Sequence, residues 1–245
     1  MSKIIDCSQL ENNHILVEEN KEESYILLYP REELIFDVKD HAKVKIAIFA
    51  SSVPSSLIKG SVGNSSSVEI YYADFTSNDN QVKTDIKLIG EDASINWHLA
   101  VLSKEKSKKG FEVSIYHQNL GTKSQIDNYG VCKDESKLTF SGICHILNGA
   151  HRSVAHQNAK IMVFDDNADA IAKPILKIDD NDIEASHSAS VGKISDEEIF
   201  YLTSRGLSME MARELITYGY LKPIIAGFDD EEVAKKITNE IERGI

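Results

Sequence analysis

Hydrophobic and polar residues alternate in short runs between about residue 13 and residue 183, and almost none of this region has helical periodicity. The runs are rich in Val, Ile and Tyr and are bounded by Asn, Asp, Gly and Ser, which is typical of strands separated by turns. We expect strands at residues 14–18, 24–28, 34–38, 44–49, 68–72, 84–88, 95–101, 112–116, 137–143 and 160–163. The pattern predicts a mainly β body.

A polar turn followed by a small residue and a strand recurs within this region. The motif reads DHAKV at 40–44, NSSSV at 64–68, EDASI at 91–95 and DESKL at 134–138. The first strand residues Val44, Val68 and Ile95 lie 24 and 27 positions apart, and Leu138 and Ile183 follow after 43 and 45 positions, close to two coils each. This period predicts a right-handed parallel β-helix, in which each coil buries its inward side chains against the next.

A sandwich of two sheets is the alternative architecture, because it also produces short alternating strands. Its turns would be expected every ~8–12 residues without a longer period. The longer period of the turn motif therefore favours the β-helix.

The sequence changes character after residue 194. Ser195 followed by Glu198 forms a capping-box signature, and Gly206 supplies a helix stop. We therefore divide the chain into a β-helix core at 1–194 and a helical region at 195–245.

Two further helices are predicted in this region. Ser208 can cap a helix over about 209–221, and Pro223 with Gly227 would end it. Asp229 with Glu232 would open a third helix over about 230–243. The residues expected on the apolar faces are Met211, Leu215 and Ile216 in the second helix and Val233, Ile237 and Ile241 in the third. These helices would either cap the end of the solenoid or dock a partner protein.

Composition narrows the class of protein. The chain has 245 residues, with 27 basic and 39 acidic side chains and a net charge of -12. This charge argues against nucleic-acid binding, which needs clustered Lys and Arg. No apolar stretch is long enough for a membrane span, and the first residues lack the apolar segment of a signal peptide. We expect no membrane association and a cytoplasmic location.

The three cysteines, Cys7, Cys132 and Cys144, form no C-x-x-C pair. Their wide spacing predicts buried free thiols and argues against a stably bound four-cysteine cluster. Cys144 and His145 are adjacent on a predicted strand, where neighbouring side chains point to opposite faces, so they are not expected to share a metal ion. The roles of Cys132 and Cys144 stay open.

Signatures of common enzymes are absent from the sequence. It has no glycine-rich phosphate loop, no G-x-S-x-G elbow and no H-E-x-x-H motif. A polysaccharide-active β-helix enzyme would hold two carboxylates about 5–10 Å apart. Such enzymes are mostly secreted and rich in aromatic residues at their clefts, whereas this chain has one Trp and no export signal. We therefore expect a protein without catalytic activity.

His187 lies among the small residues Ser186, Ser188, Ala189 and Ser190, so its imidazole can be approached closely. A neutral imidazole is a ready ligand for iron or zinc. One histidine without partners at ligand spacing is weak evidence for a metal site, and the residues alone favour a structural His bonded to a backbone carbonyl.

The stretch 174–206 carries the successive motifs P-x-L-x-I, D-x-x-A-S-H-x-A-x-V-G and D-E-x-I-F-Y-L-x-S-R-G. This succession closely resembles the carboxy-terminal signature of the SufB/SufD family, the scaffold subunits of the SUF iron–sulfur cluster assembly machinery. The likeness is strong over about 155–221 and looser back to about residue 13. Family members usually carry a helical domain before the core, and we expect it to be absent here or supplied by another protein.

The resemblance implies a β-helical scaffold subunit that acts with a SufC-like ABC ATPase and with a SufB-like chain or a second copy of itself. It implies that His187 lies at the interface between scaffolds, as a candidate ligand for a transient iron–sulfur cluster. It also implies that the ATPase docks on the carboxy-terminal helices, at Phe200, Tyr201, Arg205 and Gly206.

Two departures from the SufB pattern point to a SufD-like member. SufB members carry a cluster-linked Cys close to the position of Asn158, and they tend to carry Glu where Ser188 stands. The sequence does not distinguish a homodimer from a heterodimer, and it identifies neither the cluster type nor the sulfur donor. The alternative from another class is a structural or adaptor solenoid without iron chemistry.

Overall fold

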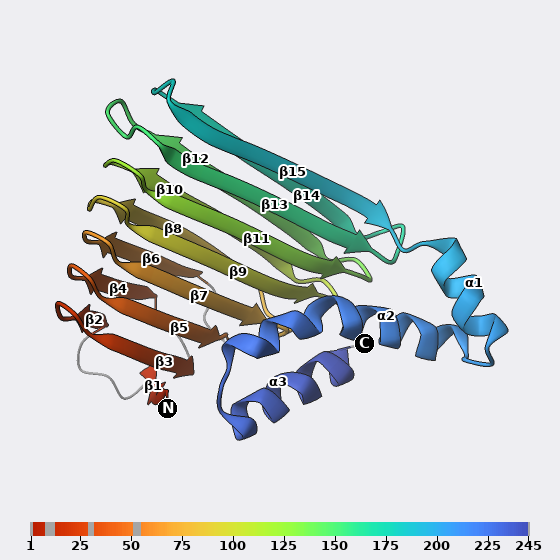
Figure 1. Ribbon diagram of the computed structural model, residues 1–245. Helices are drawn as coiled ribbons and strands as arrows, with labels where there is room; N and C mark the ends of the chain where they lie inside the picture. Colours follow the sequence, from red (N-terminus) through yellow and green to blue (C-terminus); the bar gives the residue numbers. More distant parts are fainter. Residues whose placement is uncertain (1, 8–12, 29–31, 51–54, 245) are drawn as a thin grey trace.

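The computed structural model describes residues 2–7, 13–28, 32–50 and 55–244. The chain winds into a parallel β-solenoid, and three α-helices at its carboxy-terminal end lie beside the solenoid (Figure 1). Every strand pair in the described residues is parallel. The predicted β-helix is therefore confirmed and the sandwich is excluded.

Consecutive strands alternate between two sheets, so each coil contributes one strand to each. The first sheet contains β1 (Lys3–Asp6), β3 (Glu22–Leu28), β5 (Lys43–Phe49), β7 (Ser67–Asp74), β9 (Ser94–Ser103), β11 (Lys123–Cys132), β13 (Ser153–Val163) and β15 (Ile183–Lys193). The second contains β2 (His14–Val17), β4 (Glu33–Val38), β6 (Ser55–Val62), β8 (Asn80–Leu88), β10 (Lys108–His117), β12 (Lys137–Ile146) and β14 (Asp169–Ile178). We call them the odd sheet and the even sheet.

The core of the solenoid lies between the two sheets. Alternate residues of each strand point inward, as the period of two predicts. Aromatic rings contact one another through the middle coils. The Tyr72 ring stacks on Trp97 with 6.2 Å between ring centres. Phe111 meets Tyr72 edge to face at 5.7 Å and Phe140 at 6.0 Å. Each coil thus buries its apolar side chains against the coils above and below.

The turn motif predicts part of the register correctly. Val44 pairs with Val68, and Val68 pairs with Ile95, on three neighbouring strands of the odd sheet. Leu138 does not continue this column, because it lies on β12 of the even sheet. The prediction of two coils between Ile95 and Leu138 is wrong.

The error arises because both corners of a coil use the same local chemistry. His41, Ser65 and Asp92 have left-handed backbone conformations at the corner that enters the odd sheet, and Asp134 has one at the corner that enters the even sheet. A buried small residue follows at each corner, such as Ala42 or Ser136. A local motif does not show which of two equivalent corners it occupies.

The predicted helices are present with nearly the expected bounds: α1 (Asp196–Ser204), α2 (Met209–Leu221), the 3-10 helix η2 (Lys222–Gly227) and α3 (Glu231–Gly244). The Ser195 hydroxyl accepts a bond from the Glu198 N–H, and the Ser208 hydroxyl accepts one from the Met211 N–H. Gly206 has a φ of +97°, as a helix-ending glycine should.

The predicted cap of the third helix is wrong by one residue. The Asp230 carboxylate accepts a 3.0 Å hydrogen bond from the Val233 N–H. Asp229 instead pairs with Lys45 on β5, with 3.0 Å between Nζ and Oδ2. Both aspartates suit a cap locally, and the approach of β5 decides between them.

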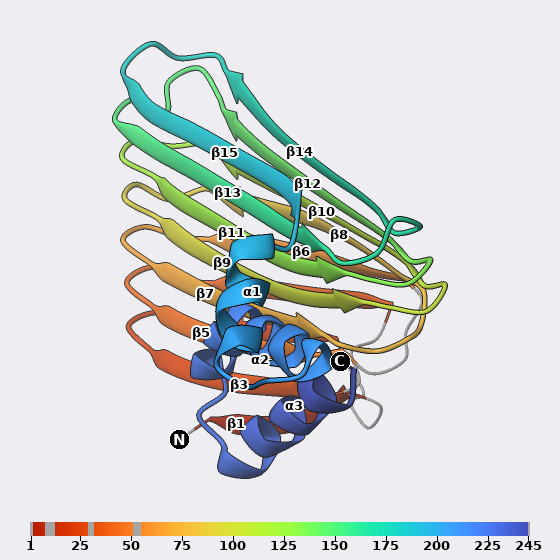
Figure 2. The ribbon, with the colours of Figure 1, turned by 90° about the vertical axis from the view of Figure 1, so that its right-hand side faces the viewer.

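The helical region packs on the outer face of the odd sheet (Figure 2). Val233, Ile237 and Ile241 of α3 are buried there, as predicted. The contact joins Leu221, Ile224, Phe228, Val233, Ile237 and Ile241 to Ile26, Ala47, Ala73, Phe75, Ala100, Leu102 and Val131. The small side chains of the sheet allow close approach, and Gly227 lies directly over the Tyr71 ring. The helices thus lie over an outer face of the solenoid and not over its last coil.

The predicted apolar face of α2 is mostly exposed. Ala212, Thr217 and Leu221 are buried, whereas Met211 and Leu215 are more than half exposed. Whether 1–194 and 195–245 are separate domains stays a prediction. No helix among the described residues is long and apolar enough to cross a membrane.

Candidate functional site

The solenoid ends in a coil that no other described segment covers. β14 and β15 are the last strands of the even and odd sheets. Inward-facing residues of this coil, such as Leu176 and Ile183, are only partly buried, and Ile178 and Val191 are each 44% exposed. Unpaired strand edges next to exposed apolar side chains are typical of surfaces that associate with another chain. We call β14 and β15 together the open end.

His187 lies in the middle of β15, on the side that faces into the solenoid. Its register partner on β13 is the buried Gln157. His187 is exposed, because no further coil stacks on β15. The described residues include no hydrogen-bond partner for its imidazole, so a carbonyl-bonded structural role gains no support. An accessible imidazole with two unoccupied nitrogens is able to bind a metal ion.

Three other histidines near the open end pair with carboxylates instead of gathering around His187. The pairs are His145–Asp179 at 2.7 Å, His151–Asp180 at 3.0 Å and His156–Glu184 at 3.6 Å. Within the described parts of the chain, no three His, Cys, Asp or Glu side chains are placed to hold a metal ion together.

Asn158 and Ser188, the two positions that point to a SufD-like member, touch each other. Ser188 Oγ donates a 2.8 Å hydrogen bond to Asn158 Oδ1, and Asn158 Nδ2 donates one to the Tyr129 hydroxyl at 3.2 Å. Both lie on the outer face of the odd sheet. His187 is next to Ser188 in sequence but points to the opposite face, so it does not join this contact.

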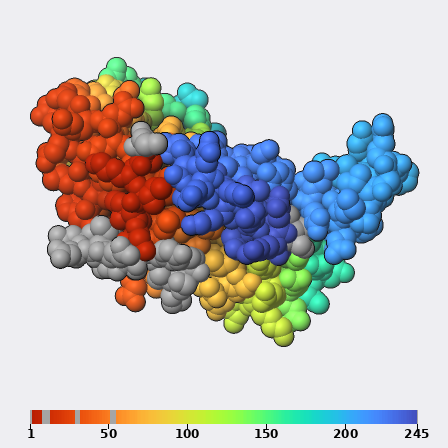
Figure 3. All heavy atoms as spheres, turned by 90° about the horizontal axis from the view of Figure 1, so that it is seen from below, coloured from red at the N-terminus to blue at the C-terminus, as the bar shows by residue number. Residues whose placement is uncertain are grey.

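The four residues predicted to dock a partner lie together on and after α1, which projects from the body of the protein (Figure 3). Phe200 is 73% exposed and Tyr201 is 57% exposed. The Arg205 guanidinium lies 5.3 Å from the centre of the Tyr201 ring, and Gly206 ends the segment. Large exposed aromatic side chains beside an arginine are typical of binding hot spots.

Sequence reasoning missed the extent of this exposed surface. Met209, Met211 and Leu215 of α2 are each more than half exposed. Helical periodicity predicted an apolar face that includes Met211 and Leu215. Periodicity identifies an apolar stripe without showing what covers it.

A polar chain inside the solenoid was also missed. The buried His117 has Nδ1 2.8 Å from Thr122 Oγ1 and Nε2 2.8 Å from Ser124 Oγ. Burial lowers the pKa of His117 to about 4. Ser124 Oγ lies 3.7 Å from Cys144 Sγ, and burial raises the pKa of that thiol to about 11. At neutral pH the interior therefore holds a neutral imidazole and a protonated thiol.

The cysteine predictions are confirmed where the structure tests them. Cys7, Cys132 and Cys144 are buried, and none of them forms a disulfide within the described residues. Cys144 points into the core while His145 lies on the outer face, so the two do not share a site. Burial also raises the pKa of Cys132. A buried, protonated thiol is a poor nucleophile and a poor metal ligand.

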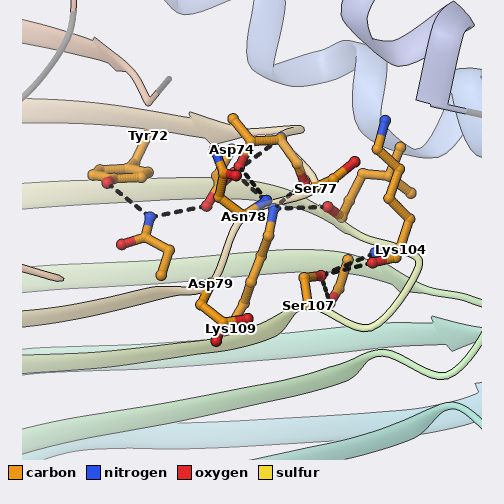
Figure 4. A network of polar contacts seen from close by, with 12 residues as sticks. Tyr72, Asp74, Ser77, Asn78, Asp79, Lys104, Ser107 and Lys109 are labelled. Atoms are coloured by element: carbon orange, nitrogen blue, oxygen red, sulfur yellow. Dashed lines mark hydrogen bonds and ion pairs between the residues drawn. The ribbon is translucent and has the colours of Figure 1, made fainter. Parts of the chain in front are cut away.

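One further charged group lies in the interior, away from the open end (Figure 4). Lys109 Nζ donates to Asp74 Oδ1 at 2.7 Å, to the Thr76 carbonyl at 2.7 Å and to the Leu102 carbonyl at 2.9 Å. Both side chains of the ion pair are fully buried. All three ammonium protons are satisfied, so this network fixes the segment after β7 and is not a reactive site.

Comparison with known proteins gives one family. The SUF system FeS cluster assembly SufBD core domain matches residues 4–220. The iron-sulfur cluster assembly protein SufD of Bacillus subtilis is 30% identical over 183 residues, which cover 75% of this chain and 42% of the relative.

Two other relatives have similar sequence identities over shorter stretches of the chain. The iron-sulfur cluster assembly protein SufB of Bacillus subtilis is 29% identical over 150 residues, covering 55% of this chain and 32% of the relative. The iron-sulfur cluster assembly protein SufD of Escherichia coli is 28% identical over 111 residues, which cover 45% of this chain and 26% of the relative. The chain thus spans less than half the length of these relatives.

Proposed function

Because the chain belongs to the SufBD family, we propose that it is a non-catalytic scaffold subunit of a SUF-type iron–sulfur cluster assembly complex in the cytoplasm. Asn158 and Ser188 stand where SufB-like chains carry other residues, which favours a SufD-like role. The cluster is the cargo of this scaffold and is held only transiently.

The observation that carries the proposal is the open end with His187 at its centre. It offers unpaired strand edges, partly buried apolar side chains and one accessible imidazole. A SufB-like scaffold or a second copy of this chain would cover the edges and bring further ligands to His187. A cluster would then assemble between the two chains.

The exposed aromatic surface of α1 is the proposed docking site of a SufC-like ABC ATPase. Hydrolysis would take place on that partner. ATP would shift the scaffold pair only if the ATPase dimer binds one arrangement of the pair better than the other. α1 is well placed to pass a movement of the ATPase on to the scaffold, because α1 projects from the body of the protein and is connected to that body through α2.

We expect the double variant Phe200→Ala, Tyr201→Ala to lose co-purification with the ATPase. Two exposed aromatic side chains at a hot spot together account for a loss of affinity on the order of 100-fold. Both side chains are largely exposed, so the fold should be retained. The matched control is Glu197→Ala, an exposed residue of the same helix. Unchanged binding by the double variant would place the ATPase elsewhere.

We expect His187→Ala to lower the yield of cluster on the reconstituted complex at least ~10-fold, as the loss of one protein ligand should. The measurement is visible absorbance and iron content after assembly with the ATPase and the second scaffold. His145→Ala is the control, because His145 lies on the outer face of the even sheet. A wild-type yield from His187→Ala would show that the imidazole is structural only and is not a ligand of the cluster.

A further inference from the structure

α2 is apolar on two sides, which an ordinary surface helix is not. One side, with Ala212 and Leu221, is buried on the body. The other side carries Met211, Leu215 and Tyr218, preceded by Leu207 in the connection from α1. The spacings of four, four and three residues place all of these on one stripe. Met211 and Leu215 of the stripe are exposed, whereas Tyr218 is partly buried against the contact between the helices and the odd sheet.

The stripe forms the floor of a groove between α2 and the last turn of α3. The groove has a volume of about 490 Å³ and is lined by Leu207, Met211, Glu214, Leu215, Tyr218 and Glu242. Met211 is 55% exposed and Leu215 is 51% exposed. The eleven positions from Leu207 to Tyr218 span about 16 Å, so the groove matches about three turns of a second helix.

The rim of the groove is negatively charged. Glu214 of α2 and Glu242 of α3 are exposed on it, and none of the described residues that line it is basic. The carboxyl end of α3 adds no free acceptor, because the Gly244 carbonyl accepts a hydrogen bond from Lys133 Nζ at 3.4 Å. An occupant with basic groups beside its apolar side chains would be stabilised by the two rim carboxylates.

Two of the basic side chains nearby, Arg213 and Arg243, contact groups outside the groove. Arg213 points to the body, with Nη1 3.8 Å from Asp165 and its guanidinium 5.6 Å from the Phe164 ring centre. Arg243 lies 3.9 Å from Glu240 on its own helix. Lys222 Nζ lies 5.4 Å from the centre of the Tyr218 ring, at one end of the stripe. The two rim carboxylates therefore stay available to a partner.

We propose that this groove binds an amphipathic helix of the ATPase partner, with apolar side chains on the stripe and Lys or Arg against Glu214 and Glu242. This inference rests on the proposed function, which brings the ATPase to the helical region, and it adds the chemistry of the element that is recognised. A second copy of this chain is disfavoured as occupant, because its own groove is acidic and its net charge is -12.

The test measures the affinity of the purified chain for the purified ATPase at about 50 mM and about 300 mM NaCl, because salt screens charge pairs at a surface. Three proteins are compared with wild type. The first carries Glu214→Gln and Glu242→Gln, and the second carries Met211→Ser and Leu215→Ser. The third, a charge-matched control, carries Glu231→Gln and Glu232→Gln at the opposite end of α3.

We expect wild-type affinity to fall roughly 10-fold with the added salt, and the Glu214/Glu242 variant to lose roughly 10-fold at low salt with little further salt dependence. The Met211/Leu215 variant should lose on the order of 100-fold and keep its salt dependence, because its charges are intact. The Glu231/Glu232 control should bind as wild type does.

Wild-type binding by both groove variants, with a loss only in the Phe200/Tyr201 variant, would overturn this inference and leave the proposed function standing. Equal losses of affinity in the Glu214/Glu242 variant and in the Glu231/Glu232 control would show that the charge effect comes from net charge alone. That result would overturn the proposed pairing of Glu214 and Glu242 with basic residues of the partner. Absence of wild-type binding at either salt concentration would overturn the proposed docking, and this inference with it.

Discussion

We expect Lys109→Met to lower the free energy of unfolding by about 3–5 kcal/mol, the usual cost of leaving one charge of a buried pair without its partner. Lys109 and Asp74 are both fully buried, and the Asp74 carboxylate would lose its ammonium neighbour at 2.7 Å. The Thr76 and Leu102 carbonyls would lose a donor as well. Urea denaturation followed by circular dichroism measures the change.

A second variant separates the charge effect from packing. Lys109→Met combined with Asp74→Asn removes both charges, and we expect it to be more stable than Lys109→Met alone. Lys106→Met is the control, because Lys106 is 81% exposed and its contact with Glu135 is at the surface. That change should cost at most about 1 kcal/mol. Equal small losses at Lys106 and Lys109 would contradict the structural role of the buried pair.

We expect His117 to make the fold sensitive to acid, with a loss of about 3 kcal/mol as the pH falls from about 6.5 to about 4. Burial lowers the pKa of His117 to about 4, whereas an unfolded histidine titrates near about 6.5. Within this window the unfolded chain binds the additional proton and the folded chain does not. The stabilising contribution is therefore complete above about pH 6.5 and decreases toward pH 4.

The measurement compares unfolding free energies of wild type and His117→Gln across this range, because carboxylates titrate in both proteins and cancel in the difference. The difference should change by about 3 kcal/mol between the two ends of the window. His151→Gln is the control, since His151 is exposed. A pH-independent difference for His117→Gln would show that the buried imidazole is not the source of acid sensitivity.

The strands and the helix ends of this protein follow from local sequence. Alternation with a period of two identified most strands, since one face of each strand must be apolar to stack on the next coil. The spacing of Val44, Val68 and Ile95 gave three positions of the true register. Ser195 and Ser208 fixed the starts of two helices, because a cap is satisfied within four residues of its own chain.

β11 is a strand that the local pattern of hydrophobic residues does not predict. It was not predicted, because two of its inward positions are the polar Ser124 and Asn128, both of which are buried. Ser124 is satisfied by His117 from the neighbouring strand of the other sheet, a partner that no local pattern specifies. The burial of Lys109 was also not predictable, because a lysine in a strand is expected to be exposed. Its three acceptors come together only in the folded structure.

In the candidate site, too, some features follow from short stretches of sequence and others only from the tertiary structure. The motif around His187 indicated the family and the candidate residue, and the motif around Phe200 indicated the proposed docking segment, because these are properties of short stretches. The exposure of His187 depends on β15 being the last strand of its sheet. The exposure of Met211 depends on which side of α2 meets the odd sheet, and Ala47, Ala73 and Ala100 come to that face from three different coils. The sequence by itself determined which side chains are apolar, capped or reactive, while the stacking of distant coils decided which of them another molecule can reach.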